Sequence, residues 1–118
     1  MAVRAIETID MSGPIDRGHL ARMTFGDRDL EHEVLQLFDR QAELLVARMR
    51  GGEAAAVAAL AHTLKGSAAG IGAGPVALAA EATEQAVSSA GDVSQAIDRL
   101  AAAVEQARAL IAVLLRKD

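Results

Sequence analysis

The stretch 57–68 reads Val57-Ala58-Ala59-Leu60-Ala61-His62-Thr63-Leu64-Lys65-Gly66-Ser67-Ala68. Its apolar residues recur at the spacing of one helix face, which predicts an amphipathic helix with a single buried stripe. The residues of that stripe are Val57, Leu60, Ala61, Leu64 and Ala68. At about 100° per residue, His62 falls roughly 140° from the centre of the stripe. We therefore expect the imidazole to point toward solvent.

The neighbours of His62 on the outer face of this helix are too small to cover the ring. They are Ala58, Ala59, Gly66 and Ala69, and Lys65 lies one turn away. A glycine inside a helix costs about 1 kcal/mol relative to alanine, so the absence of a side chain at Gly66 calls for a reason. Close approach of another protein supplies one. The pattern favours a docking site around His62 over a surface histidine without a function.

Helix start and stop signals divide the rest of the chain. A short helix is predicted over about 16–23 with Asp16 as its N-cap, and a turn at 25–27 leads into a long helix that Asp27 caps. That helix runs to about residue 50, where Gly51-Gly52 ends it. Its predicted inward face consists of Leu30, Val34, Leu37, Phe38, Ala42, Leu45 and Met49.

Further helices follow on both sides of a glycine-rich connection. The helix that carries His62 is predicted over about 53–69, and the connection 70–74 is predicted to be flexible. Pro75 suits the first turn of the next helix, over about 75–90, and Asp92 to Gln95 has the form of a capping box for a last helix. Short turns between long helices imply antiparallel neighbours. The fold class is therefore all-α: an up-down-up-down four-helix bundle, over 14–118, with a short extra N-terminal helix and a loose lead-in over 1–13.

Composition excludes several classes of protein. The 118 residues contain no cysteine, which removes disulfides and thiolate metal sites. Phe25 and Phe38 are the only aromatic residues, so the core must consist of Leu, Val, Ile, Met and many Ala. A net charge of −4 without a basic patch argues against nucleic acid as a partner. The chain shows no signal peptide and no apolar run of bilayer length. We expect a soluble cytoplasmic monomer with no membrane partner.

The sequence gives little support for a metal site, a phosphate-binding loop or a catalytic triad. His19 and His32 lack partners at ligand spacing, so we expect no metal site. Gly70-x-Gly72-x-Gly74 follows a helix rather than a strand and is not followed by Lys-Ser/Thr, so a helix stop is favoured over a phosphate loop. Serine, histidine and aspartate do not occur in the context of a catalytic triad.

The segment from His62 to Ala68, followed by Ile71-Gly72-Ala73, resembles the signature of the histidine-containing phosphotransfer (HPt) domain of bacterial phosphorelays. The resemblance extends upstream to Phe25-Gly26-Asp27 and Phe38 and downstream to Glu84, so that it covers about 14–116. The chain departs from the family pattern at Gly70, where Asn is frequent, and at Thr83, where an apolar residue is usual. These departures concern the local turn and packing.

The resemblance implies that His62 accepts a phosphoryl group from a receiver-domain aspartate and passes it to another receiver domain. Lys65 would stabilise the added charge, and Gly66 would allow the partner to approach. Glu84 would orient the ring through Nδ1–H, although a plain surface glutamate is an equally good interpretation. The partner interface is predicted at Ala58, Ala59, Ala69 and Ile71.

The implied partners are response-regulator receiver domains and a hybrid sensor histidine kinase. The chain would need no cofactor of its own, because the receiver domain would bring Mg²⁺, and it would be a phosphoryl carrier rather than an enzyme. Two alternatives remain. A histidine kinase is disfavoured because Thr63 follows the histidine instead of an acidic residue, and because no ATP-binding glycine boxes are present. The other alternative is a helical adaptor that binds signalling proteins without being phosphorylated.

Overall fold

The structure, a computed structural model, describes residues 5–116 of the chain, and every regular element among them is helical. A 3₁₀ helix, η1 (Ala5–Thr8), precedes five α-helices. These are α1 (Arg17–Met23), α2 (Arg28–Met49), α3 (Ala54–Ile71), α4 (Gly74–Ser88) and α5 (Val93–Arg116).

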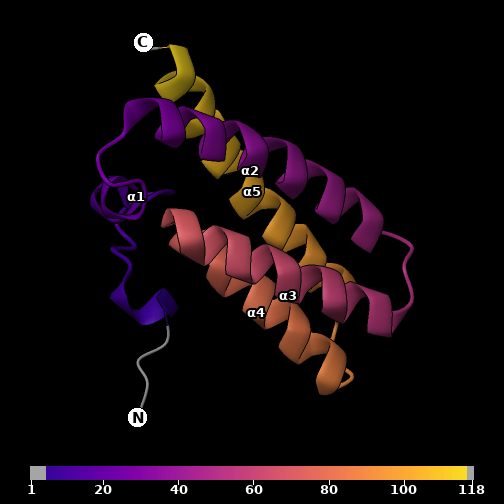
Figure 1. Cartoon of the computed structure of the whole chain (residues 1–118). Helices are drawn as coiled ribbons and strands as arrows, with labels where there is room; N and C mark the ends of the chain where they lie inside the picture. The colour runs from indigo at the N-terminus through magenta and orange to yellow at the C-terminus, as the bar shows by residue number, and fades with distance from the viewer. Residues whose placement is uncertain (1–4, 117–118) are drawn as a thin grey trace.

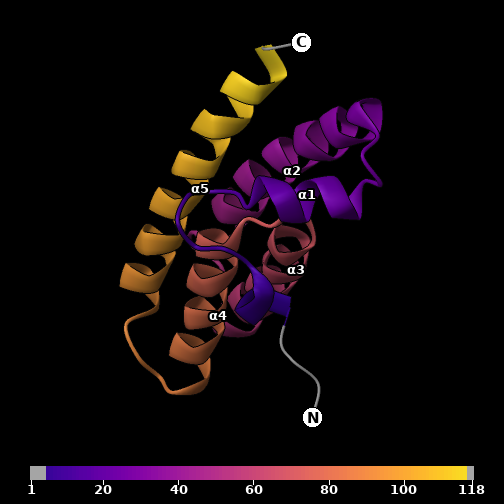
Figure 2. The ribbon, with the colours of Figure 1, turned by 90° about the vertical axis from the view of Figure 1, so that its left-hand side faces the viewer.

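The four long helices, α2 to α5, form the antiparallel up-down-up-down bundle that the sequence predicts (Figures 1 and 2). α3 packs on α2 and α4, and α5 completes the bundle by packing on the same two helices. α1 runs across one end of the bundle and contacts α3 (Figure 1). α3 therefore has an outer surface that lies between α2 and α4.

The predicted caps are present. Asp16 accepts a hydrogen bond from the His19 N–H at 3.0 Å and starts α1, while Asp27 accepts from the Leu30 N–H at 3.1 Å and starts α2. Asp92 accepts from the N–H of residue 95 at 2.9 Å, ahead of α5. Each carboxylate satisfies an amide that the first helical turn leaves without a partner.

The prediction of a flexible connection over 70–74 is wrong. α3 continues through Ile71, and only two residues separate it from α4. Gly72 takes a left-handed conformation with φ of 82°, and the N–H of Ala73 donates to the Ala68 carbonyl at 2.8 Å. This hydrogen-bond pattern closes the end of a helix. The connection is also anchored to α1, because the Asp16 N–H donates to the Gly72 carbonyl at 2.8 Å.

The lead-in also differs from the prediction of a loose segment over 1–13. Its residues 1–4 lie outside the described part of the chain, but from residue 5 onward it packs against the bundle. η1 contacts α3 and α4, and the side chains of Ile6 and Ile9 are buried. The N–H of Asp10 donates to the Asp16 carboxylate at 2.9 Å, which fastens the lead-in to the start of α1. The hydrophobic core therefore begins before the predicted boundary at residue 14.

The inward face of α2 is rotated relative to the prediction. Leu35 and Val46 are buried together with Phe38, Ala42 and Met49, whereas Leu37 is half exposed. Apolar residues occur on more than one side of this helix, so the periodicity did not specify which side faces α3 and α5. Packing against both neighbours selected the buried stripe.

Small residues fill the interface between α3 and α4. Ala61 and Ala68 on α3, and Ala77 and Ala80 on α4, are fully buried, which lets the two helix backbones approach closely. Thr83, which departs from the family pattern, is also buried, and its hydroxyl donates to the Ala79 carbonyl at 2.9 Å. The polar group is thereby satisfied within its own helix.

Ion pairs connect α5 to α2 and to its C-cap residue, Arg50. Arg108 pairs with Asp39 at 2.8 Å and with Glu43 at 2.6 Å, and Arg50 pairs with Asp98 at 2.8 Å. Within residues 5–116, no helix is sufficiently long and apolar to cross a membrane.

Candidate functional site

His62 lies near the middle of α3 on its outer surface, and 70% of its side chain is exposed. The ring is nevertheless held in place, because its Nδ1 lies 3.1 Å from the Glu84 Oε2 on α4. A carboxylate oxygen only accepts, so Nδ1 carries the proton in this contact. In the neutral imidazole the lone pair is then on Nε2, which has no hydrogen-bond partner among the described residues.

Glu84 connects the histidine to a lysine. Its second carboxylate oxygen, Oε1, lies 2.8 Å from the Lys65 Nζ, and both side chains are about three-quarters buried. Partial burial acts to raise the pKa of Glu84, but hydrogen bonds and charge from Lys65 and His62 outweigh burial and hold the pKa below its usual value. Glu84 is therefore ionised at neutral pH and shared between the ring and the ammonium group.

This arrangement follows from the register of α3 against α4. His62 and Lys65 are three residues apart on α3, so they lie on adjacent turns of one face. The antiparallel packing of α4 brings Glu84 level with both of them. The sequence predicted that Glu84 approaches the ring, but it did not predict that the same carboxylate binds Lys65.

The surface beside the ring is open at the glycine. Gly66 is exposed, and a Cβ built on it would meet no heavy atom within 4 Å. Ala59 is exposed, and Ala58 is half-buried at the edge facing α4. A partner can therefore approach α3 closely over the turn that follows His62.

Two residues of the predicted partner interface are not on this surface. Ala69 and Ile71 are buried, with 9% and 8% of their surface exposed. Ile71 belongs to α3 rather than to a loop, and it lines a shallow pocket with Phe38 of α2. Both residues are therefore less exposed than the predicted partner interface requires.

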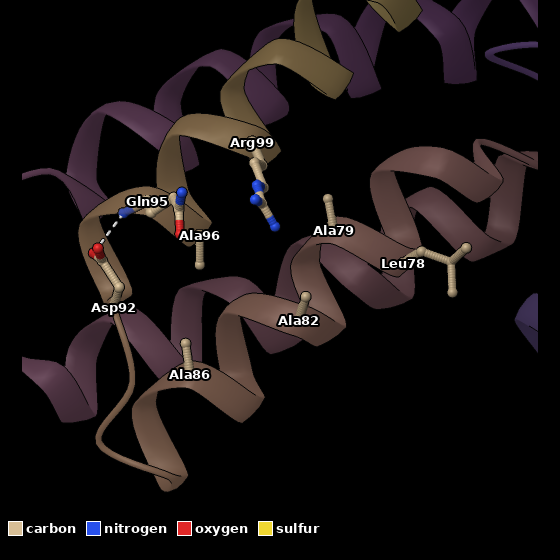
Figure 3. Close-up of a pocket in the computed structure, with 8 residues that line it drawn as sticks. All are labelled: Leu78, Ala79, Ala82, Ala86, Asp92, Gln95, Ala96 and Arg99. Carbon is tan, nitrogen blue, oxygen red and sulfur yellow. Dashed lines mark hydrogen bonds between the residues drawn. The ribbon is translucent and has the colours of Figure 1, made fainter.

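Two hollows flank α4. One, of about 330 Å³, is lined by Ala58, Lys65, Glu81, Glu84, Gln85, Val87 and Ser88. The other, of about 420 Å³, lies between α4 and α5 (Figure 3). Its lining comes from α4, with Leu78, Ala79, Ala82 and Ala86, and from the start of α5, with Gln95, Ala96 and Arg99, together with Asp92. It is on the α5 side of α4, whereas Glu84 reaches toward α3. Of these two hollows, only the first is lined by Glu84, the residue that contacts His62.

Exposed leucines on α2 were missed by the sequence reasoning. Leu37 and Leu44 are each about half exposed, and Leu37 lines a shallow pocket with Ser67 of α3. Periodicity had assigned Leu37 to the core, and no signal in the chain distinguished it from a core leucine. No group of three or more potential metal ligands occurs within residues 5–116, and neither His19 nor His32 belongs to such a group.

Comparisons with known proteins agree with this geometry. The Hpt domain family model matches residues 28–110, which contain His62, Lys65, Gly66 and Glu84. No curated protein matches the chain. The crystal structure of histidine-containing phosphotransfer protein B (HptB) from Pseudomonas aeruginosa PAO1 is similar, with a TM-score of 0.81 and 19% sequence identity over 91% of this chain and 98% of that chain. At that identity, the similarity shows a shared fold. Because the family model spans most of its length, the chain belongs to the Hpt domain family, the histidine phosphotransfer domains of phosphorelays.

Proposed function

We propose that His62 is the phosphorylated residue of this Hpt domain: it accepts a phosphoryl group from the aspartyl phosphate of one receiver domain and passes it to the aspartate of another. The observation that supports this proposal best is the exposed ring, with Nδ1 bound to Glu84 and Nε2 without a partner within residues 5–116. A nucleophile needs a free lone pair and an open approach, and Nε2 has both.

The reaction is a single displacement at phosphorus. The Nε2 lone pair forms the N–P bond while the P–O bond to the donor aspartate breaks, and that bonding pair returns to the carboxylate. Such a transfer depends on positioning and charge stabilisation more than on covalent chemistry from the protein. Glu84 positions the ring, while Gly66 leaves room for the donor.

Lys65 provides positive charge one turn from the ring. It is held by Glu84, 2.8 Å away, and a flexible ammonium group can also reach an anion on the exposed side of the helix. We expect it to stabilise the phosphoryl group without being essential for the fold. Ala58 and Ala59 would lie beneath the docked partner.

The chain acts in this proposal as a phosphoryl carrier without kinase activity of its own. Its partners would be response-regulator receiver domains and a hybrid sensor histidine kinase, and Mg²⁺ would be supplied by the receiver domain. We expect a monomer that works in the cytoplasm.

The test is His62→Gln. The variant should fold like the wild type, because the side chain is 70% exposed, and it should take up no phosphate from a phosphorylated receiver domain. The product on the wild type should be acid-labile and alkali-stable, as expected for phosphohistidine. Retained label on the variant would assign the reaction to another residue. A wild type that binds receiver domains but is never labelled would favour the adaptor instead.

A further inference from the structure

The hollow between α4 and α5, of about 420 Å³, lies in a face of the molecule that carries few charges (Figure 3). The glutamates of α4, Glu81 and Glu84, line the other hollow, beside α3. Arg108 of α5 pairs with α2. The α4–α5 hollow therefore has only two charged lining residues, Asp92 and Arg99, among alanines. Depletion of charge with retention of arginine is typical of the centre of a protein–protein interface.

The two charges lie at opposite ends of the α4–α5 hollow (Figure 3). Asp92 is at the end near Ala86, where it caps α5 by accepting from the N–H of residue 95 at 2.9 Å. Arg99 projects nearer the other end, and it forms no ion pair or hydrogen bond within residues 5–116. Leu78 lies beyond Arg99, with 47% of its surface exposed. One end thus offers an anion near a small side chain, and the other offers a cation near a protruding apolar side chain.

We infer that the α4–α5 hollow binds the same surface of a second copy of this chain, in a symmetric dimer. The two-fold axis of this dimer runs across the helices, so that α4 packs antiparallel on α4 and α5 packs antiparallel on α5. Such an axis brings opposite ends of one surface together. Arg99 then faces Asp92 of the partner subunit, and Leu78 packs over Ala86 of the partner subunit. Each contact occurs twice, so the surface is self-complementary in both charge and shape.

The contact is small, so the dimer is weak and reversible. The hollow has 8 lining residues on each copy, whereas a standard protein–protein interface has about 20–30 residues a side. Exposed ion pairs add little affinity individually. The monomer expected above is therefore the form at low concentration. Association leaves both His62 rings open, because the hollow is on the α5 side of α4, whereas Glu84 reaches toward α3.

Sedimentation velocity of the full chain over about 1 μM to 1 mM measures this association. The wild type should shift from monomer toward dimer as its concentration rises. Arg99→Asp should raise the dissociation constant about tenfold or more, because it places two pairs of like charges opposite each other. Asp92→Asn should weaken the dimer by a smaller factor, since it removes the charge while asparagine still caps α5.

Exchanging the charges tests whether these two residues face each other. Asp92→Arg alone should associate as poorly as Arg99→Asp alone. An equimolar mixture of the two variants should form a heterodimer, because one reversed charge on each copy restores both pairs of opposite charges. Arg40→Asp is the matched control, since it makes the same charge reversal at an exposed position of α2 outside the hollow. It should associate like the wild type.

Three results would overturn the inference. The first is a wild type that stays monomeric over the whole concentration range, and the second is Arg99→Asp that associates like the wild type. The third is a mixture of the two charge-reversed variants, both folded by circular dichroism, that stays monomeric. Labelling of His62 by a phosphorylated receiver domain is a separate measurement. Its absence in the wild type would overturn the proposed function and leave the dimer intact.

Discussion

Gly66 should be the position where stability and function respond in opposite directions. It lies inside α3, is exposed, and has no heavy atom within 4 Å of the place where a Cβ would be. Replacing a helical glycine by alanine is then expected to stabilise the fold by about 0.8–1 kcal/mol. For a chain of this size, the melting temperature should rise by about 3–6 °C. Gly66→Arg should gain slightly less stability than Gly66→Ala, because arginine ranks just below alanine as a helix former.

Phosphoryl transfer should change in the other direction. The arginine side chain would extend one helical turn from His62, into space that a docked partner needs. Forcing a bulky group into a packed contact costs about 1–3 kcal/mol, which corresponds to a loss of transfer rate of roughly 5- to 150-fold. Gly66→Ala, which adds a single methyl group, should lose much less.

The assay pairs thermal denaturation with the rate of transfer from a phosphorylated receiver domain that labels the wild type. Ala102→Arg is the control, since Ala102 is exposed on α5, and α5 packs on α2 and α4 rather than lining the His62 surface. It adds the same side chain at a distance from the histidine and should leave transfer unchanged. The reasoning is refuted if Gly66→Arg keeps the wild-type rate, or if it melts well below the wild type.

Two further predictions concern Lys65 and Gly72. Lys65→Ala should slow transfer while changing stability by no more than about 1 kcal/mol, as is typical of a partly exposed ion pair, and an unchanged transfer rate would remove Lys65 from the mechanism. Gly72→Ala should destabilise the fold by about 2–4 kcal/mol in urea denaturation, because φ is 82° and the new Cβ would lie 2.8 Å from the Asp16 carbonyl oxygen. Gly70→Ala, with no atom within 4 Å, is its control, and equal stability of the two variants would contradict the assigned role of Gly72.

Local signals in the sequence were sufficient to predict the α-helices and their order. The apolar spacing around Leu64, the caps at Asp16 and Asp27 and the glycines at 51 and 52 are properties of neighbouring residues. Antiparallel packing follows because the turns are too short for anything else. The exposure of His62 was also predictable, since its angle on α3 depends only on the helical repeat.

The sequence was less informative about segments whose environment comes from distant residues. Ile6 and Ile9 are buried in the described part of the lead-in, and their burial depends on the surface that α3 and α4 present to η1. The connection after α3 was taken to be flexible because glycines permit many conformations. A hydrogen bond from Asp16 selects one of them.

Helix periodicity, caps and turns are encoded locally, and they were enough to predict a helical bundle with an exposed histidine on its second long helix. The contacts of one carboxylate, Glu84, with His62 and Lys65 became visible only in the folded chain, as did the burial of Ala69 and Ile71. These contacts depend on the register of α3 against α4 and α2. That register is set by the packing of small side chains from separate helices. The spacing of residues within a single helix does not specify it.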